Sequence, residues 1–406
     1  MRTGRGWSPG RVSVAALVVY LLSRCVSTGY LLIARGQQEP YPRWTGEDGE
    51  VGLLDMSVLW DGSWYRAIAE DGYPSELPLH EDGTVRQNQW AFYPLFPVLS
   101  RILMIIPGVD FRLAGTVVSL VAGAGAAVLM ARLFARYTPA PLAVAAVGVW
   151  AVQPAAPTMQ VAYTESLATL VLVAALTALV DRRWYAVAGL AFVLGLTRPI
   201  TLPFALVVGL VFLWEARRWW QGRERDPRDL IPPLLATVIA GASGLMWATI
   251  VGIGTGVPDG YPQTMAAWRA GGEIVPFRPW IDNTAILLFR DAESPRVLAA
   301  LAVGALAVFL VAATAGPWAA RLPPELRLWM VAYPAYLAAA LDVGTSLIRY
   351  AVPLFPLALV LIGGGLRRPP RWWPLLAGVV VLALVWLQYR WTLGLFVFVP
   401  PSDYPP

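Results

Sequence analysis

The residues whose types and spacing could carry chemistry begin with the stretch 60–74, WDGSWYRAIAEDGYP. Its pattern predicts one short helix that Asp55 or Ser57 could cap and that Gly72 would end. Asp61 would then lie beside an aromatic stripe, where the helix meets an apolar layer. A carboxylate there loses hydration, so it needs a partner or a function. Asp61 is therefore the candidate catalytic base, and an ordinary solvated aspartate on a surface helix is the alternative.

The aromatic stripe indicates where this helix would lie. Trp60, Trp64 and Ile68 follow one another at intervals of four residues and so share one helix face. The stripe is too short to cross a bilayer, and its indole rings, with the phenol of Tyr65, favour the boundary between water and lipid. We therefore predict a helix at a membrane surface, with Trp60, Trp64 and Tyr65 supporting Asp61.

Arginines in or beside apolar runs form a second set of candidates, because charges at membrane depth are costly and tend to be functional. Arg198 and Arg349 each lie at the end of an apolar run, and their guanidinium groups suit a phosphate. Arginines that extend toward lipid headgroups are the alternative. Arg24 lies within the first apolar run and needs a partner there, such as Glu165 or a donor phosphate. Glu165 itself would orient an acceptor, pair with an arginine, or simply favour a helix N-terminus.

Four segments, taken in order along the chain, carry a resemblance to a known family. They are residues 60–74, residues 92–97 (FYPLFP), residues 162–166 (AYTES) and residues 349–350 (RY). Together they resemble the PIG-V-type mannosyltransferases, the family of the second mannosyltransferase of glycosylphosphatidylinositol assembly, within the GT-C glycosyltransferases. At 162–166 the chain departs from the family, which tends to have Y-S-E-S. The loop after residue 254 and the C-terminus match no family segment.

The resemblance implies an activity and a set of roles. A family member transfers a mannosyl or other hexosyl residue from a polyprenyl-phosphate donor to an acceptor hydroxyl outside the membrane, with inversion. The match at residues 349–350 favours Arg349 over Arg198 as a contact for the donor phosphate, and charge at membrane depth makes Arg198 and Arg24 further candidates. The resemblance also adds Tyr163, Tyr350 and Glu165 as substrate-supporting residues. The acceptor would be a lipid, a glycan or a protein. A transporter or lipid flippase and an inactive subunit of envelope assembly are the alternatives.

Composition places the chain among membrane proteins. It is 57% hydrophobic and 14% charged, with a mean hydropathy of +0.57, whereas soluble domains are about 45–50% apolar and about 25% charged. We predict one membrane-embedded unit over residues 1–406. The 31 basic residues are all arginine, which is typical of a GC-rich, bacterial source. They lie mostly in short loops between apolar runs and so indicate topology rather than a nucleic-acid partner.

Cysteine and histidine limit the metal and redox chemistry of the chain. There is one cysteine and one histidine, which excludes an internal disulfide and a zinc site built on histidines. The outer segment beside residues 60–74 has no D-x-D pair. We therefore predict no cofactor and no metal ligands, and the need for a free divalent ion stays open.

Apolar runs of about 20 residues, the length that a span requires, predict an all-α polytopic membrane protein, and the resemblance implies that its fold is of the GT-C type. We expect about eleven spans, at residues 12–33, 112–134, 140–157, 163–181, 184–199, 201–215, 232–253, 297–316, 327–343, 347–365 and 373–397. Residues 34–111 would form a long external loop, with residues 90–107 as a second interfacial or re-entrant helix. More than half of the arginines then fall in short cytoplasmic segments. This places the N-terminus in the cytoplasm and the site on the external face of a bacterial plasma membrane.

Overall fold

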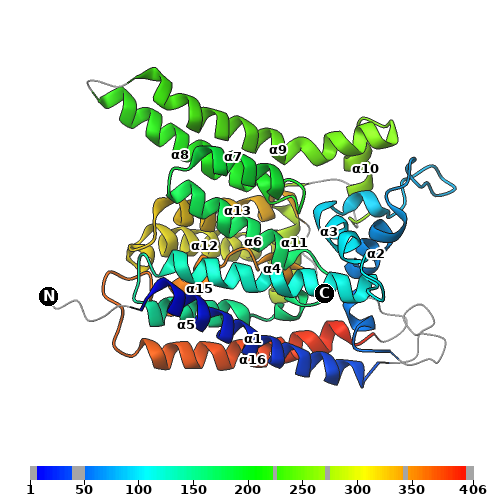
Figure 1. The fold of residues 1–406 in the computed structure, drawn as a ribbon, viewed down its shortest axis with the longest axis horizontal. Coiled ribbons are helices and arrows are strands. Elements are labelled where there is room, and N and C mark those ends of the chain that lie inside the picture. The colour runs from blue at the N-terminus through cyan, green and yellow to red at the C-terminus, as the bar shows by residue number, and fades with distance from the viewer. Residues whose placement is uncertain (1–6, 39–50, 223–225, 270–274, 342–345, 399–406) are drawn as a thin grey trace.

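The computed structural model describes residues 7–38, 51–222, 226–269, 275–341 and 346–398. Within these ranges the chain forms helices and one isolated antiparallel bridge, between Leu79 and Val85. The predicted all-α class is therefore confirmed for the described residues. Figure 1 shows the long helices lying roughly side by side, with the short helices α2 and α3 gathered at one end of them.

Five helical segments are long and apolar enough to cross a membrane. They are α1 (Pro9–Arg35), α4 (Phe111–Phe134), the segment Pro227–Thr255 that contains η4 (Pro227–Leu230) and α9 (Ile231–Thr255), α12 (Pro295–Ala315) and α16 (Trp373–Phe396). The other predicted spans correspond to helices that are shorter or less apolar. They are α5 (Ala140–Ala151), α6 (Glu165–Val180), α7 (Trp184–Leu194), α8 (Thr201–Gln221), α13 (Pro324–Ala340), α14 (Leu347–Tyr350) and α15 (Pro356–Leu361). A membrane-type helical fold is thus supported, and the count of eleven spans stays a prediction.

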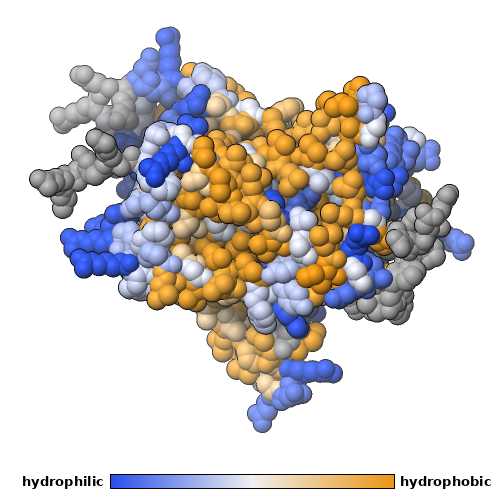
Figure 2. Space-filling model, turned by 60° about the horizontal axis from the view of Figure 1, so that its bottom comes forward, coloured by the Kyte–Doolittle hydropathy of each residue, from blue (hydrophilic) through white to orange (hydrophobic). Residues whose placement is uncertain are grey.

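The outer surface of the long helices is apolar. On α12, Val308 and Phe309 are 70% and 54% exposed. Figure 2 shows a broad hydrophobic face with hydrophilic residues gathered toward its edges. An exposed apolar area of this size marks an interaction surface, and a lipid bilayer is the partner that helices of this length and composition fit. In contrast, α6 is buried on almost all sides, so its apolar side chains belong to the protein core.

The segment between α1 and α4 forms only short elements. They are η1 (Asp55–Val58), α2 (Asp61–Asp71), η2 (Gln89–Ala91) and α3 (Leu95–Leu103). With nine residues, α3 rises only about 13 Å, less than half of a hydrocarbon core of about 30 Å. Residues 90–107 therefore do not form a full-length spanning helix, in agreement with the sequence prediction. Their position at a membrane interface stays a prediction.

The predicted single span at 347–365 is wrong as a continuous helix, because the chain breaks between α14 and α15. Pro353 and Pro356 explain the break, since proline removes a backbone donor and disfavours helix in the preceding residue. Two buried indoles satisfy carbonyl groups that the break leaves open. Trp150 Nε1 donates to Val352 O at 3.1 Å, and Trp329 Nε1 donates to Pro353 O at 2.8 Å.

The predicted topology can be tested with single cysteines in a chain that carries Cys25→Ala. Arg86 lies in the segment predicted to be external, and Arg218 in the turn predicted to be cytoplasmic, and both side chains are exposed. We expect Arg86→Cys to react with a membrane-impermeant maleimide in intact cells, and Arg218→Cys to react only after the membrane is opened. The reverse pattern would invert the topology and place the candidate site in the cytoplasm.

Candidate functional site

Four charged side chains from distant parts of the chain meet in a row of alternating sign. Arg349 Nη1 donates to Asp61 Oδ2, and Arg198 Nη1 donates to Glu165 Oε1. Arg349 Nε lies 3.3 Å from Glu165 Oε1 and so joins the two pairs. We call Asp61, Arg349, Glu165 and Arg198 the ion cluster. Three of its members come from the segments 60–74, 162–166 and 349–350, which the sequence analysis singled out separately.

Burial differs along the ion cluster. The side chains of Glu165 and Arg349 are 1% and 3% exposed, whereas those of Asp61 and Arg198 are 16% and 14% exposed. Charges this deeply buried are tolerated because each has an opposite charge in contact with it and the cluster is neutral as a whole. The centre of the cluster is thus a fixed structural element, and its two ends, Asp61 and Arg198, are the members that a ligand can reach.

Backbone geometry places Asp61 at the start of α2. The prediction that Asp55 or Ser57 caps this helix is wrong, because both residues lie in η1 and α2 begins at Asp61. Trp60 separates the two helices with a positive φ of 48°, which turns the chain sharply. Asp55 instead binds Arg112 at 2.6 Å. Asp61 therefore occupies the first turn of α2, where the helix dipole favours a carboxylate.

Close packing against Ser57 explains why position 62, the third residue of the W-D-G sequence, is glycine. A Cβ at this position would lie 2.6 Å from the carbonyl oxygen of Ser57. That oxygen also accepts a hydrogen bond from Ala162 N at 3.0 Å. The close contact therefore ties the start of α2 to the segment that carries Glu165, and only glycine fits it.

We expect Gly62→Ala to destabilise the protein by about 1–3 kcal/mol, as overpacked buried sites do, and to move Asp61 away from Arg349. The measurement is thermal denaturation of the purified protein, with Gly72→Ala as the control. Gly72 has open space around it but a φ of +86°, so that change strains only the end of the helix. A loss below about 1 kcal/mol in Gly62→Ala would show that the Ser57 contact relaxes at little cost and would contradict this expectation.

Two tyrosines contact the arginines of the ion cluster. The Arg349 guanidinium lies 5.2 Å from the ring centres of both Tyr163 and Tyr350, and the Arg198 guanidinium lies 5.0 Å from the Tyr350 ring. Cation–π contacts of this kind stabilise a desolvated guanidinium. The Tyr163 hydroxyl also donates to Leu59 O at 3.0 Å, which fixes that ring beneath Arg349. The structure thus brings both predicted supporting tyrosines into the site.

Tyr65 lies on α2 close to the same charges. Burial raises the pKa of the Tyr65 phenol well above its ordinary value, Asp61 and Glu165 raise it further, and Arg198 and Arg349 act in the opposite direction. The phenol is therefore neutral at physiological pH. It can accept and donate hydrogen bonds at the site, but it cannot act as a base.

The tryptophans of the stretch 60–74 contact protein rather than only lipid. Trp64 stacks on Phe92 at 5.9 Å between ring centres and meets Trp268 edge-on at 5.6 Å. Trp60 meets Phe396 edge-on at 5.6 Å. Phe92 belongs to the segment 92–97, so the fourth segment of the sequence resemblance also lies next to α2.

Several polar atoms of the ion cluster have no hydrogen-bond partner among the described residues. Glu165 Oε2 is buried without a hydrogen-bond partner, and Arg349 Nε makes only the ion contact with Glu165, without hydrogen-bond geometry. Among the described residues, Arg198 makes a hydrogen bond only through Nη1, and Asp61 accepts one only at Oδ2. Buried polar groups are usually satisfied. A ligand that carries both hydroxyl groups and an anion would satisfy these atoms.

Arg24 does not join the ion cluster, contrary to one of its predicted pairings. Its guanidinium donates to Ala151 O at 2.5 Å and to Ala156 O at 2.6 Å, and it also contacts Ser23 Oγ. Ala151 is the last residue of α5, so its carbonyl has no partner within the helix. The sequence could not show that α5 ends there. Arg24 therefore has its partners in the backbone, and neither Glu165 nor a phosphate is needed to explain its burial.

Sequence reasoning missed two residues at this site. Ser346 Oγ accepts a contact from Arg349 Nη2 at 3.4 Å, and its position three residues before Arg349 was the available signal. Trp268 lies in the loop after residue 254, which matches no segment of the resembling family. Its buried Nε1 has no hydrogen-bond partner, and its ring packs against Trp64 on α2.

The ion cluster can perform acid–base and anion-binding chemistry. Asp61 is a carboxylate with one open oxygen, and Arg198 offers unused donors to an anion, at opposite ends of a fixed cluster. Among the described residues, no group of three or more histidine, cysteine, aspartate or glutamate side chains is arranged to hold a metal ion. Comparison of the chain with models of protein families gives no match, and comparison with curated proteins gives none either.

Proposed function

We propose that this chain is a membrane glycosyltransferase that moves a mannosyl or other hexosyl residue from a polyprenyl-phosphate donor to an acceptor hydroxyl. The observation that carries the proposal is the ion cluster. It joins Asp61, Glu165 and Arg349, which lie in three segments of the PIG-V-type resemblance, and Phe92 of the fourth segment lies against Trp64 on α2. Convergence of separate segments on one charged site favours a shared chemical role over four unrelated structural ones.

Arg198 is the best-placed contact for the donor phosphate. It is more exposed than Arg349, and its Nε and Nη2 groups have no hydrogen-bond partner among the described residues. The leaving group of such a donor is already a phosphate, so it needs charge stabilisation more than protonation, and a guanidinium fork supplies that. Arg349 then serves mainly to hold Asp61 and Glu165 in place. This reverses the order of the two arginines expected from sequence.

Asp61 is the proposed general base. Arg349 holds Oδ2, which leaves the second oxygen to accept the proton of the acceptor hydroxyl. In the single displacement that the resemblance implies, the acceptor oxygen bonds to the anomeric carbon as the bond from that carbon to the phosphate oxygen breaks. The proton moves to Asp61, and the electron pair leaves with the polyprenyl phosphate. No cofactor is required by this scheme.

The proposal includes a location. It includes the GT-C fold with eleven spans and a cytoplasmic N-terminus. It also places the site at the external face of a bacterial plasma membrane, where the acceptor is a lipid, glycan or protein. The five long apolar helices support the membrane setting. Residues 51–89 contain only two basic residues, Arg66 and Arg86, and this scarcity supports the external placement.

The test is transfer of radiolabelled mannose from a polyprenyl-phosphate donor in membranes that contain the chain. We expect label to move into an acceptor fraction, and we expect membranes with an Asp61→Asn variant to lose this transfer. Transfer from other hexosyl donors would identify the sugar. Passage of intact labelled donor across sealed vesicles, without cleavage, would instead establish a flippase and contradict the proposal.

A further inference from the structure

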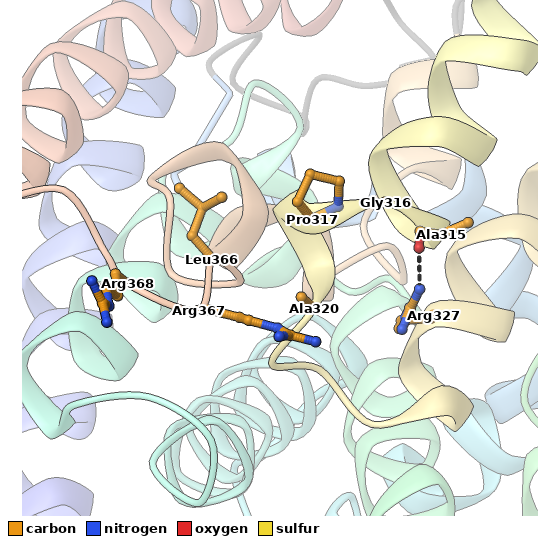
Figure 3. Close-up of a pocket in the computed structure, with 8 residues that line it drawn as sticks. All are labelled: Ala315, Gly316, Pro317, Ala320, Arg327, Leu366, Arg367 and Arg368. Carbon is orange, nitrogen blue, oxygen red and sulfur yellow. Dashed lines mark hydrogen bonds between the residues drawn. The ribbon is translucent and has the colours of Figure 1, made fainter.

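A second basic site lies at the other end of the helices from the ion cluster. A cavity of about 800 Å³ is lined by Ala315, Gly316, Pro317, Ala320, Arg327, Leu366, Arg367 and Arg368. Figure 3 shows Arg327 and Arg368 on opposite sides of Pro317 and Leu366, with the side chain of Arg367 extending below Ala320 toward Arg327. None of the lining residues is acidic. We call this cavity the arginine pocket.

The position of the arginine pocket follows from α6 and α13. Glu165 of the ion cluster begins α6, and Arg182 follows the far end of that helix. Arg182 contacts Glu325 in the first turn of α13 at 2.6 Å, and Arg327 lies two residues farther along α13. Because α6 has 16 residues, it separates the two sites by about 24 Å. The pocket is therefore independent of the proposed transfer site.

The walls of the arginine pocket are fixed by backbone contacts. A Cβ on Gly365 would lie 2.1 Å from Trp318 O, so the two segments that form the pocket touch through their main chains. Arg321 N donates to Gly365 O at 2.9 Å, and Arg321 Nη2 donates to Arg367 O at 2.7 Å. The positions of Arg367 and Arg368 in the pocket are thus determined by the fold.

The arginines of the pocket differ in how many of their guanidinium donors already have a hydrogen-bond partner. Arg327 donates to Thr314 O at 2.7 Å and to Ala315 O, which completes the end of α12. Arg367 and Arg368 are exposed, and their guanidinium groups make no hydrogen bond or ion pair with the described residues. The guanidinium donors of these two arginines are therefore open, and a phosphate accepts several charge-assisted hydrogen bonds from such donors at once.

The surroundings of the pocket indicate that this phosphate belongs to a lipid. The pocket lies at the end of α12, whose outward side chains are strongly exposed and apolar. Trp318, next to Pro317, is 45% exposed and lies 5.8 Å from Phe309. A tryptophan at the end of an apolar helix is typical of the headgroup level of a bilayer. Basic pockets between helices at that level bind anionic headgroups.

We propose that the arginine pocket binds the phosphate of an anionic membrane lipid, with Arg367 and Arg368 as its principal contacts. The lipid chains would lie along the apolar surface of α12, and Leu366 and Pro317 would contact the headgroup base. This site lies in the leaflet opposite to the ion cluster and takes no part in the proposed transfer reaction.

Native mass spectrometry of the full-length protein tests this proposal. The protein is released from detergent micelles after incubation with phosphatidylglycerol or with phosphatidylcholine. We expect wild type to retain phosphatidylglycerol preferentially, and Arg367→Gln/Arg368→Gln to retain it at least about tenfold less, since two hydrogen bonds to charged groups are lost. The matched control is Arg217→Gln/Arg218→Gln, an exposed adjacent pair outside the pocket with the same change in charge. Melting temperatures of all three proteins report whether they are folded.

Two results would overturn the proposal. Equal losses in both double variants would show that the general surface charge, and not the pocket, attracts the lipid. Displacement of phosphatidylglycerol by inorganic pyrophosphate, with the same dependence on Arg367 and Arg368, would assign the pocket to a soluble phosphate compound. The proposal is supported if wild type and the Arg217→Gln/Arg218→Gln control retain phosphatidylglycerol while the Arg367→Gln/Arg368→Gln variant loses it.

Discussion

Asp61→Asn is expected to lower the rate of hexosyl transfer by about 10²–10⁴-fold, the usual contribution of a positioned general base. Asparagine has nearly the same shape, so it keeps the start of α2 and can still accept a hydrogen bond from Arg349 through its amide oxygen. It cannot accept the acceptor proton. The measurement is turnover of a labelled polyprenyl-phosphate donor, with donor affinity measured separately, and we expect the loss in turnover alone.

Controls for this prediction lie on the same helix. Asp61→Glu keeps the carboxylate but moves it by one methylene, so we expect only partial recovery. Glu70→Gln and Asp71→Asn should have little effect, because both residues are exposed and Glu70 forms a surface ion pair with Arg66 at 2.9 Å. Substantial transfer in Asp61→Asn would show that this carboxylate is structural, and Glu165, with its open Oε2, would become the next candidate base.

Arg349→Gln is expected to destabilise the protein by about 3–5 kcal/mol, because removing one partner of a buried ion pair leaves uncompensated charge. Here Asp61 and Glu165 would both lose the guanidinium that joins them, and Glu165 is almost fully buried. Unfolding of the purified protein in detergent, followed by tryptophan fluorescence, measures the loss. A change below about 1 kcal/mol, the usual value for an exposed pair, would contradict the burial of this cluster.

A double-mutant cycle separates structure from chemistry in the same residues. The pair Asp61→Asn and Arg349→Gln should be less destabilised than the sum of the single variants, since both charges are removed together. Arg349→Lys keeps the charge but loses the planar fork that reaches two carboxylates. We expect this variant to fold and to lose most of its transfer activity. Wild-type turnover in Arg349→Lys would show that the fork is not needed for positioning Asp61.

The sequence singled out the four residues that form the ion cluster, but it did not predict the contacts between them. Charges at membrane depth and the four resembling segments pointed to Asp61, Glu165, Arg198 and Arg349 one at a time. The contact between Asp61 and Arg349 joins residues 288 positions apart. Spacing along one helix cannot show such a contact, because it depends on how α2, α6 and α14 pack in three dimensions.

Local structure was predictable where one residue determines it, and less so where packing decides. Gly72 ends α2 as predicted, because its positive φ suits glycine. The start of α2 was misplaced because Trp60 adopts a positive φ that is rare for a large side chain and that tertiary contacts must stabilise. The break at 351–355 was missed because apolar composition alone does not separate a buried broken segment from a continuous span.

Ion pairs hold both ends of α6, and this limits how the protein can move. Glu165 anchors the first turn in the ion cluster, and just beyond the other end Arg182 contacts Glu215 at 2.8 Å and Glu325 at 2.6 Å. A shift of α6 along its axis by one turn would separate the pairs at both ends simultaneously. Transporters expose one site to each side of the membrane in turn by moving such central elements against their neighbours. A central helix fixed at both ends disfavours alternating access and suits a site that substrates reach from one side only.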